Sequence, residues 1–294
     1  MASRTILSTG NVMTAGAGVI RKPTLEKSNT ELVNSLRENF RAASSFTLPL
    51  GASPTTAAKN NPAARLAPAE WTKLGSDRVL YVPMEGGEPH GLSEEREEYD
   101  VTVKLFYLPG IPSSSRCTHT KEAVHLVCKE LGISSIDLLI VSFPNISFDA
   151  EDEDISSEED VNEWVRTYRT LEGLHSAKKV SKIGLAEFGA TRLSQLLPHT
   201  NVKPSVDQIN VRDCCVVPKP LILYAKERNI ELLTHNDCTD ILPVDTLKQL
   251  VVDEFGLFGT DAKLAPQWVV KYTAVIRSRG VVENKGYIAM AEVH

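Results

Sequence analysis

Strand-like and helix-like stretches alternate between residues 101 and 234, and this alternation constrains the fold more than any other feature of the sequence. Strands are expected at 101–107, 136–142, 182–185, 205–210 and 230–234, and helices at 120–131, 160–176, 191–197 and 221–228. The strand at 137–141 reads Asp-Leu-Leu-Ile-Val, which is too continuously apolar for a sheet with one face in water. Helices should therefore cover both faces, as parallel sheets require.

The number of strands suggests a closed barrel. Further strands are expected near 5–12, 78–82 and 273–276, which brings the total to about eight, the number that closes a parallel (β/α)8 TIM barrel. We therefore expect one α/β barrel domain over residues 1–294. An open doubly wound sheet is the alternative, but no glycine-rich dinucleotide fingerprint follows a strand.

Two segments outside this alternation have a distinct composition. A helix at 30–40 precedes residues 42–70, which are rich in Pro, Ala, Ser and Asn, and we expect a mobile surface loop there. Acidic residues crowd the stretch 151–160, where they suit the positive end of the helix that follows. The alternative is that this acidic run docks a basic partner surface.

Composition excludes several classes of protein. The chain has 294 residues, 42% of them hydrophobic and 24% charged, as in a soluble globular protein. A net charge of -6 with scattered basic residues argues against nucleic-acid binding, and the lack of an apolar stretch of about 18 residues argues against a membrane role. Five cysteines without CxxC spacing suit a reducing compartment, so we expect a cytoplasmic protein.

A metal site is not expected. Two cysteines and two histidines lie close together in the predicted helix at 120–131 and just before it, but they lack a second ligand pair at zinc spacing; they are Cys117, His119, His125 and Cys128. Burial or surface placement accounts for these side chains.

Several segments in the right order resemble the aldo-keto reductase family; they are residues 103–105, 136–144, 171–188, 204–210 and 275–278. The resemblance implies a barrel of that family's type, lacking part of its C-terminal elements. It places Lys104 at the catalytic lysine, Gln208 at the nicotinamide-binding glutamine, and Arg277 and Ser278 at the contacts to the cofactor phosphate.

The same comparison shows departures from the family's chemistry. Ser142 stands where the family has a catalytic histidine, and no Asp and Tyr pair is found before residue 100. Glu187 stands in place of one residue of the family's Ser-Asn pair, which binds the nicotinamide. Glu283 replaces an arginine that would face a 2′-phosphate. We therefore expect no catalytic residues, no bound cofactor and, at most, a vestigial NADPH site.

Residues 208–218, 230–237 and 278–288 closely resemble the glutamate-cysteine ligase modifier subunits. The resemblance implies a non-catalytic chain that forms a heterodimer with the catalytic subunit, improves its use of glutamate and relieves feedback inhibition by glutathione. It leaves two other functions open, an NADPH-dependent aldo-keto reductase and a scaffold protein without effect on a ligase.

Two pairs of residues are candidates for contact with the partner. Cys214 and Cys215 follow a predicted strand, and a thiol there could form a disulfide with the partner; burial of both is the alternative. His235 and Asp237 lie at the C-terminal end of a predicted strand, where barrels place functional loops. Ordinary turn formation is the alternative for this second pair.

Overall fold

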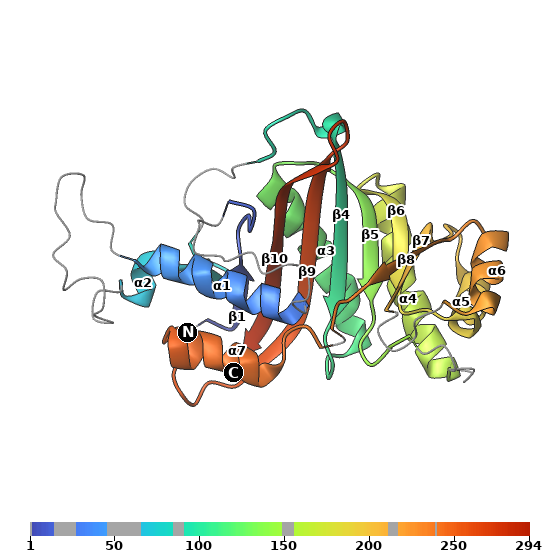
Figure 1. The fold of residues 1–294 in the computed structure, drawn as a ribbon. Helices are drawn as coiled ribbons and strands as arrows, with labels where there is room; N and C mark the ends of the chain where they lie inside the picture. The colour runs from blue at the N-terminus through green and yellow to red at the C-terminus, as the bar shows by residue number, and fades with distance from the viewer. Residues whose placement is uncertain are drawn as a thin grey trace.

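The computed structural model describes residues 2–14, 28–45, 66–84, 91–148, 156–210, 217–238 and 240–294. Within these residues the chain forms one mixed sheet of ten strands, in the order β2-β3-β1-β10-β9-β4-β5-β6-β7-β8 (Figure 1). The strands are β1 Arg4–Ser8, β2 Lys73–Leu74, β3 Val79–Val82, β4 Tyr99–Tyr107, β5 Ile136–Ser142, β6 Val180–Ala186, β7 Val206–Asn210, β8 Glu231–His235, β9 Leu264–Ile276 and β10 Val281–Val293.

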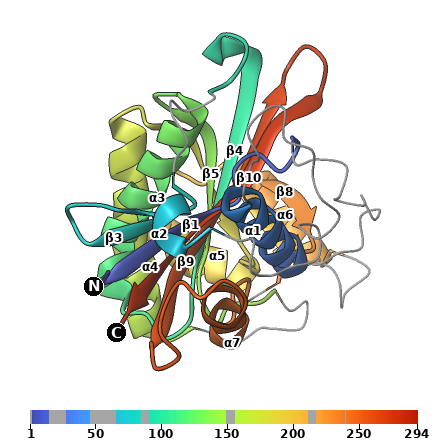
Figure 2. The same cartoon turned by 90° about the vertical axis from the view of Figure 1, so that its left-hand side faces the viewer.

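Helices cover both faces of the sheet (Figure 2). One face carries α3 Arg116–Leu131, α4 Glu158–Ser176, α5 Ala190–Leu196 and α6 Lys219–Glu227, and the other carries α1 Ser28–Ser44, α2 Pro68–Trp71 and α7 Val244–Lys248. A π-helix at Gln249–Glu254 continues α7, and 3-10 turns lie at Arg96–Glu98, Ser113–Ser115 and Leu197–His199. Two hydrophobic cores result, one on each face.

The parallel half of the sheet follows directly from the sequence pattern. Strands β4 to β8 are parallel neighbours, and α3, α4, α5 and α6 connect them in turn. Alternate side chains of β4, such as Val103 and Leu105, are buried against these helices, whereas Phe106 joins the other core. The predicted alternation of parallel strands and covering helices is confirmed in this part of the chain.

The start of α4 shows why the acidic stretch favours a helix. The hydroxyl of Ser157 accepts a hydrogen bond from the backbone N–H of Asp160 at 3.1 Å, and the first turn is acidic. Trp164, Tyr168 and Leu171 then lie buried on one face, as their helical spacing predicts. Residues 151–155 of the acidic run lie outside the described residues.

The remaining strands differ from the predicted ring of eight parallel strands. The predicted strand at 273–276 is the end of β9, which runs antiparallel to both β4 and β10, and β2 and β8 stand at the two ends of the sheet order. β9 and β10 are joined by a tight turn in which Gly280 adopts a φ of 63°. A short turn can join only antiparallel strands, because a parallel pair needs a long crossover connection.

The N-terminal region also differs in its boundaries. The amphipathic helix expected at 30–40 is confirmed as α1, but the helix continues to Ser44, and α2 begins at Pro68. The expected mobile loop at 42–70 therefore overlaps two helices, and its residues 46–65 lie outside the described residues. No helix in the described part of the chain is both long and apolar enough to cross a bilayer.

Candidate functional site

Charged side chains from distant parts of the sequence meet near the C-terminal ends of the parallel strands. We call this group the charged cluster; it consists of Lys104 in β4, Glu187 after β6, His235 and Asp237 at and after the end of β8, and Lys271 in β9. Lys104 and Lys271 are paired neighbours in the antiparallel register of β4 and β9. The sheet topology thus creates the cluster.

Asp237 is the centre of the charged cluster. One carboxylate oxygen lies 2.8 Å from Lys104 Nζ, the other lies 3.2 Å from Lys271 Nζ, and the side chain of Asp237 is only 4% exposed. Burial raises the pKa of Asp237, but the two lysines outweigh it and hold the pKa below its usual range. Burial in turn lowers the pKa of Lys104, against the opposing effect of Asp237. The pair is therefore a buried ion pair, and each charge depends on the other.

His235 and Glu187 form the second half of the charged cluster. His235 Nδ1 accepts a hydrogen bond from the backbone N–H of Asp237 at 3.1 Å, so a neutral imidazole carries its proton on Nε2. Nε2 lies 2.7 Å from Glu187 Oε1, a contact that becomes an ion pair when the imidazole is protonated. The other Glu187 oxygen accepts from the backbone N–H groups of Phe148 and Asn210, at 2.7 and 3.4 Å.

These contacts fix the charge of Glu187. Burial raises its pKa, but His235 and the two backbone N–H groups outweigh this effect, and the pKa is lowered. Glu187 also adopts a left-handed backbone conformation with a φ of 68°, which is uncommon for a residue other than glycine. A carboxylate therefore occupies one of the two positions at which the resemblance to aldo-keto reductases predicts a Ser-Asn pair.

β7 contributes two polar residues beside this cluster. Gln208 Oε1 is buried and has no hydrogen-bond partner among the described residues. Asp207 is completely buried, and its Oδ1 accepts a weak hydrogen bond of 3.4 Å from the backbone N–H of Phe188. Burial raises the pKa of Asp207 well above its ordinary value, so this carboxyl is favoured in its protonated form.

Helix α1 is anchored beside the charged cluster. Glu31 accepts a hydrogen bond from the hydroxyl of Tyr287 at 2.6 Å and pairs with Lys285. The ammonium of Lys271 lies 6.0 Å from the centre of the Tyr287 ring, and Ser28 accepts a hydrogen bond from the backbone N–H of Cys238 at 3.0 Å. The cluster therefore ties α1 to β9, β10 and the loop after β8.

Arg277 and Ser278 lie away from the charged cluster. The Arg277 guanidinium binds Asp100 at 2.9 Å and Asp137 at 3.2 Å, at the starts of β4 and β5, and Ser278 is exposed in the β9–β10 turn. Arg277 follows Lys271 by six positions, which is about 20 Å of extended chain. Of the four residues expected at a cofactor site, Lys104 and Gln208 thus lie toward the C-terminal ends of the parallel strands. Arg277 and Ser278 lie at the N-terminal ends.

The residues present do not fit a nicotinamide cofactor. Lys104 forms an ion pair with Asp237, and Arg277 forms ion pairs with Asp100 and Asp137. Glu187, whose backbone N–H bonds to the carbonyl of Gln208, adds a carboxylate next to β7. Glu283, expected to oppose a 2′-phosphate, accepts a hydrogen bond from the Tyr99 hydroxyl at 2.5 Å, at the same end as Arg277.

The other residues singled out in the sequence are placed as follows. Cys214 and Cys215 lie outside the described residues. Cys117 and Cys128 lie in α3 as unpaired thiols, and no group of three or more possible metal ligands occurs in the part of the chain that the structure describes. Sequence reasoning missed Glu31 and Lys271. A lysine within the apolar run of β9 was the one available signal, because an isolated charge in such a run needs a buried partner.

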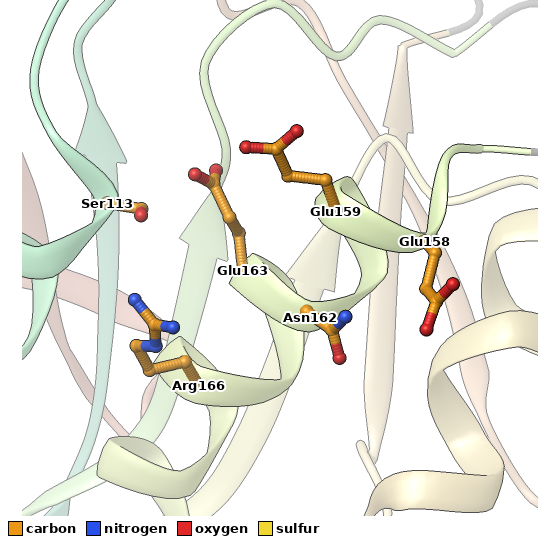
Figure 3. A pocket seen from close by; sticks show the side chains of 6 residues that line it. All are labelled: Ser113, Glu158, Glu159, Asn162, Glu163 and Arg166. Carbon is orange, nitrogen blue, oxygen red and sulfur yellow. The ribbon is translucent and has the colours of Figure 1, made fainter.

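A second polar site lies at the start of α4 (Figure 3). A hollow of about 510 Å³ is lined by Ser113, Glu158, Glu159, Asn162, Glu163 and Arg166. Glu159 and Glu163 extend to the same side of the helix, while Glu158 points away from them (Figure 3). Glu163 also lies 3.4 Å from the buried Arg116 guanidinium, which lies over the neighbouring rings of Tyr107 and Phe143. The acidic run thus continues into a hollow of negative lining.

Comparison with known proteins agrees with the fold and narrows the family. The model of the aldo/keto reductase family matches residues 87–237. The glutamate–cysteine ligase regulatory subunit of Homo sapiens is 34% identical over 203 residues, which cover 68% of each chain. A putative glutamate–cysteine ligase regulatory subunit of Schizosaccharomyces pombe is 29% identical over 217 residues, covering 69% of this chain and 75% of the relative.

More distant similarities lead to reductases. A 9,11-endoperoxide prostaglandin H2 reductase of Trypanosoma cruzi is 24% identical over 217 residues, covering 72% of this chain and 69% of the relative. Among solved structures, a Bombyx mori aldo-keto reductase in complex with NADP matches with a TM-score of 0.35 and 22% identity, over 48% of this chain and 42% of that one. The match thus spans less than half of that reductase. The chain belongs to the aldo/keto reductase family and, within it, to the glutamate–cysteine ligase regulatory subunits.

Proposed function

We propose that this chain binds the catalytic subunit of glutamate–cysteine ligase as a heterodimer and activates it. In this function it lets the catalytic subunit work at lower glutamate concentration and weakens feedback inhibition by glutathione. The observation that carries the proposal is the 34% identity to regulatory subunits over 68% of both chains. Its cysteines, which lack a disulfide pattern in the sequence, support a place in the reducing cytoplasm.

The charged cluster supports a chain without carbonyl-reductase chemistry of its own. A reductase of this family needs a lysine that lowers the pKa of a proton-donating tyrosine, but the Lys104 ammonium is 2.8 Å from Asp237 and 5% exposed. The tyrosine hydroxyl placed near the cluster, that of Tyr287, donates to Glu31, and its pKa is raised. Burial is the largest cause of that rise, and Glu31 adds to it. A proton donor would need the opposite shift.

Activation without contact with substrates must be a shift between conformations of the partner. The regulatory chain can favour the active conformation only by as much as it binds that conformation more tightly than the inhibited one. A tenfold preference corresponds to about 1.4 kcal/mol, which a small group of well-packed contacts can supply.

The test is the rate of the purified catalytic subunit at increasing glutamate concentration, with and without this chain, at fixed glutathione and with a reducing agent. The proposal expects a lower glutamate requirement or weaker inhibition when the chain is present. If a catalytic subunit from the same organism shows neither change, the proposal is wrong.

The alternative function is an NADPH-dependent reductase, which the family match and the Trypanosoma cruzi relative favour. Fluorescence titration of the chain with NADPH separates the two. We propose that no saturable binding occurs, because the residues expected to hold the cofactor are divided between two ends of the sheet.

A further inference from the structure

A hollow with apolar walls and a cationic rim lies between the 3-10 turn Leu197–His199 and helix α6. It has a volume of about 350 Å³ and is lined by Leu197, Pro198, Lys203, Tyr224 and Arg228. We call it the α6 hollow. Helix α6 stands at the outer end of the molecule, beyond β7 and β8 (Figure 1). None of its lining residues belongs to the charged cluster or lines the acidic hollow at α4.

The two cations of the α6 hollow are Lys203 and Arg228. Neither has a buried carboxylate partner among the described residues, whereas Lys104 and Lys271 of the charged cluster share Asp237. Lys203 Nζ donates to the carbonyl of Leu197 at 2.7 Å and to the carbonyl and hydroxyl of Thr200 at 3.2 and 3.1 Å. All three acceptors are uncharged, and in the described part of the chain no carboxylate pairs with Lys203. Its positive charge thus remains available to a partner.

Arg228 is held in an orientation suited to binding a carboxylate. Its guanidinium stacks on the ring of Tyr224 at 3.5 Å, and Nη1 bonds to the carbonyl of Tyr224 and to Glu227. Nε and Nη2 make no hydrogen bond to a described residue. Glu227 is 71% exposed and its pairing with Arg228 is a surface contact, which is worth little and is easily replaced.

The surroundings of the α6 hollow combine positive charge with exposed apolar surface. Lys219 and Lys226 are further exposed cations on α6, in a chain whose net charge is -6. The same helix exposes Ile222 and Leu223, which are 44% and 51% accessible. Charge complementarity therefore favours a partner segment that carries both an acidic and an apolar side chain.

We propose that the α6 hollow is a docking site for the catalytic subunit of the ligase. It receives an apolar side chain that packs on Leu197, Pro198 and Tyr224, next to a carboxylate that binds the fork of Arg228 and is attracted by Lys203. A planar guanidinium fixed by stacking can bind such a carboxylate through two parallel hydrogen bonds. This inference rests on the proposed function, because it names the surface that the partner contacts.

The test is the affinity of the purified catalytic subunit from the same organism for variants of this chain, measured by isothermal titration calorimetry. Arg228→Glu and Tyr224→Ala should each weaken binding by about tenfold or more, because charged and aromatic contacts dominate interfaces. Arg228→Lys, which keeps the charge and loses the fork, should lie between Arg228→Glu and the unmodified chain. The matched control is Lys226→Glu, the same charge reversal roughly half a turn around α6 at a residue that does not line the hollow, which should weaken binding far less than Arg228→Glu.

The outcomes separate this inference from the proposed function. If the unmodified chain does not bind the catalytic subunit, the proposed function fails and the docking site fails with it. If the unmodified chain binds and circular dichroism shows folded Arg228→Glu and Tyr224→Ala variants that bind equally well, the docking site is refuted while the function stands.

Cross-linking tests the chemistry of the occupant independently. A benzophenone side chain placed at position 223, beside the hollow, should cross-link to a segment of the catalytic subunit in which an Asp or Glu adjoins an apolar residue. Cross-links to a second copy of this chain, or to a segment without an acidic residue, would overturn the inference.

Discussion

Removing the carboxylate of Asp237 should destabilise the protein strongly. Lys104 and Asp237 have side chains that are 5% and 4% exposed, and Lys271 reaches the same carboxylate from β9. Asp237→Asn keeps the shape of the side chain but leaves Lys104 charged, buried and without its counter-ion. Breaking a buried ion pair from one side costs about 3–5 kcal/mol. For a chain of this size we expect the melting temperature to fall by roughly 5–8 °C.

A double-mutant cycle separates the lost pair from other effects of the substitution. Lys104→Met removes the buried charge, so the double variant Lys104→Met with Asp237→Asn should recover at least half of the stability lost in Asp237→Asn. The assay is urea-induced unfolding followed by circular dichroism at pH 7. The control is Arg277→Met, which removes exposed ion pairs with Asp100 and Asp137 and should cost at most about 1 kcal/mol.

Two results would refute this reasoning. The first is an Asp237→Asn variant no less stable than Arg277→Met, which would mean that Lys104 finds other compensation. The second is a double variant that is less stable than Asp237→Asn, which would mean that Lys104 contributes mainly through packing.

Three further predictions concern pH, packing and the cysteines. The folded-state pKa of Asp207 is raised, so its contribution to stability is complete below its unfolded pKa of about 4 and is lost as the pH rises toward the folded-state pKa. Asp207→Asn should therefore make the unfolding free energy fall less steeply between pH 5 and 8. An unchanged dependence of the unfolding free energy on pH would contradict this. Gly286→Ala should lower the unfolding free energy by about 1–3 kcal/mol, because a Cβ there would overlap a buried tyrosine hydroxyl and a backbone carbonyl. Gly173→Ala in α4, where the space around the Cβ is open, should raise it by about 0.5–1 kcal/mol. Urea denaturation midpoints check both variants. If Cys214 or Cys215 links the chain to its partner, replacing both with Ser should abolish an oxidant-dependent heterodimer band on non-reducing gels, and a band of unchanged intensity would exclude the link.

The charged cluster could be predicted only in part from the sequence. The resemblance to aldo-keto reductases singled out Lys104, and position at a strand end singled out His235 and Asp237, and the structure brings these residues together. Glu187 was noted for the cofactor contact it replaces, but its close contact with His235 was not foreseen. Lys271 was not identified, because its role depends on an antiparallel pairing of β4 with a strand more than 160 residues later.

The sequence by itself determined the type and order of elements from β4 to β8, because helical and strand periodicities are local and each element buries one stripe or face. It also determined helix α1, whose Leu32, Leu36 and Phe40 recur at helical spacing and are buried. Only the tertiary structure decided that β9 and β10 enter the sheet as an antiparallel hairpin between β1 and β4. The same insertion carries Arg277 to the opposite end of the sheet from Lys104. Strand direction and strand neighbours depend on contacts between distant segments, and local periodicity is the same for either direction.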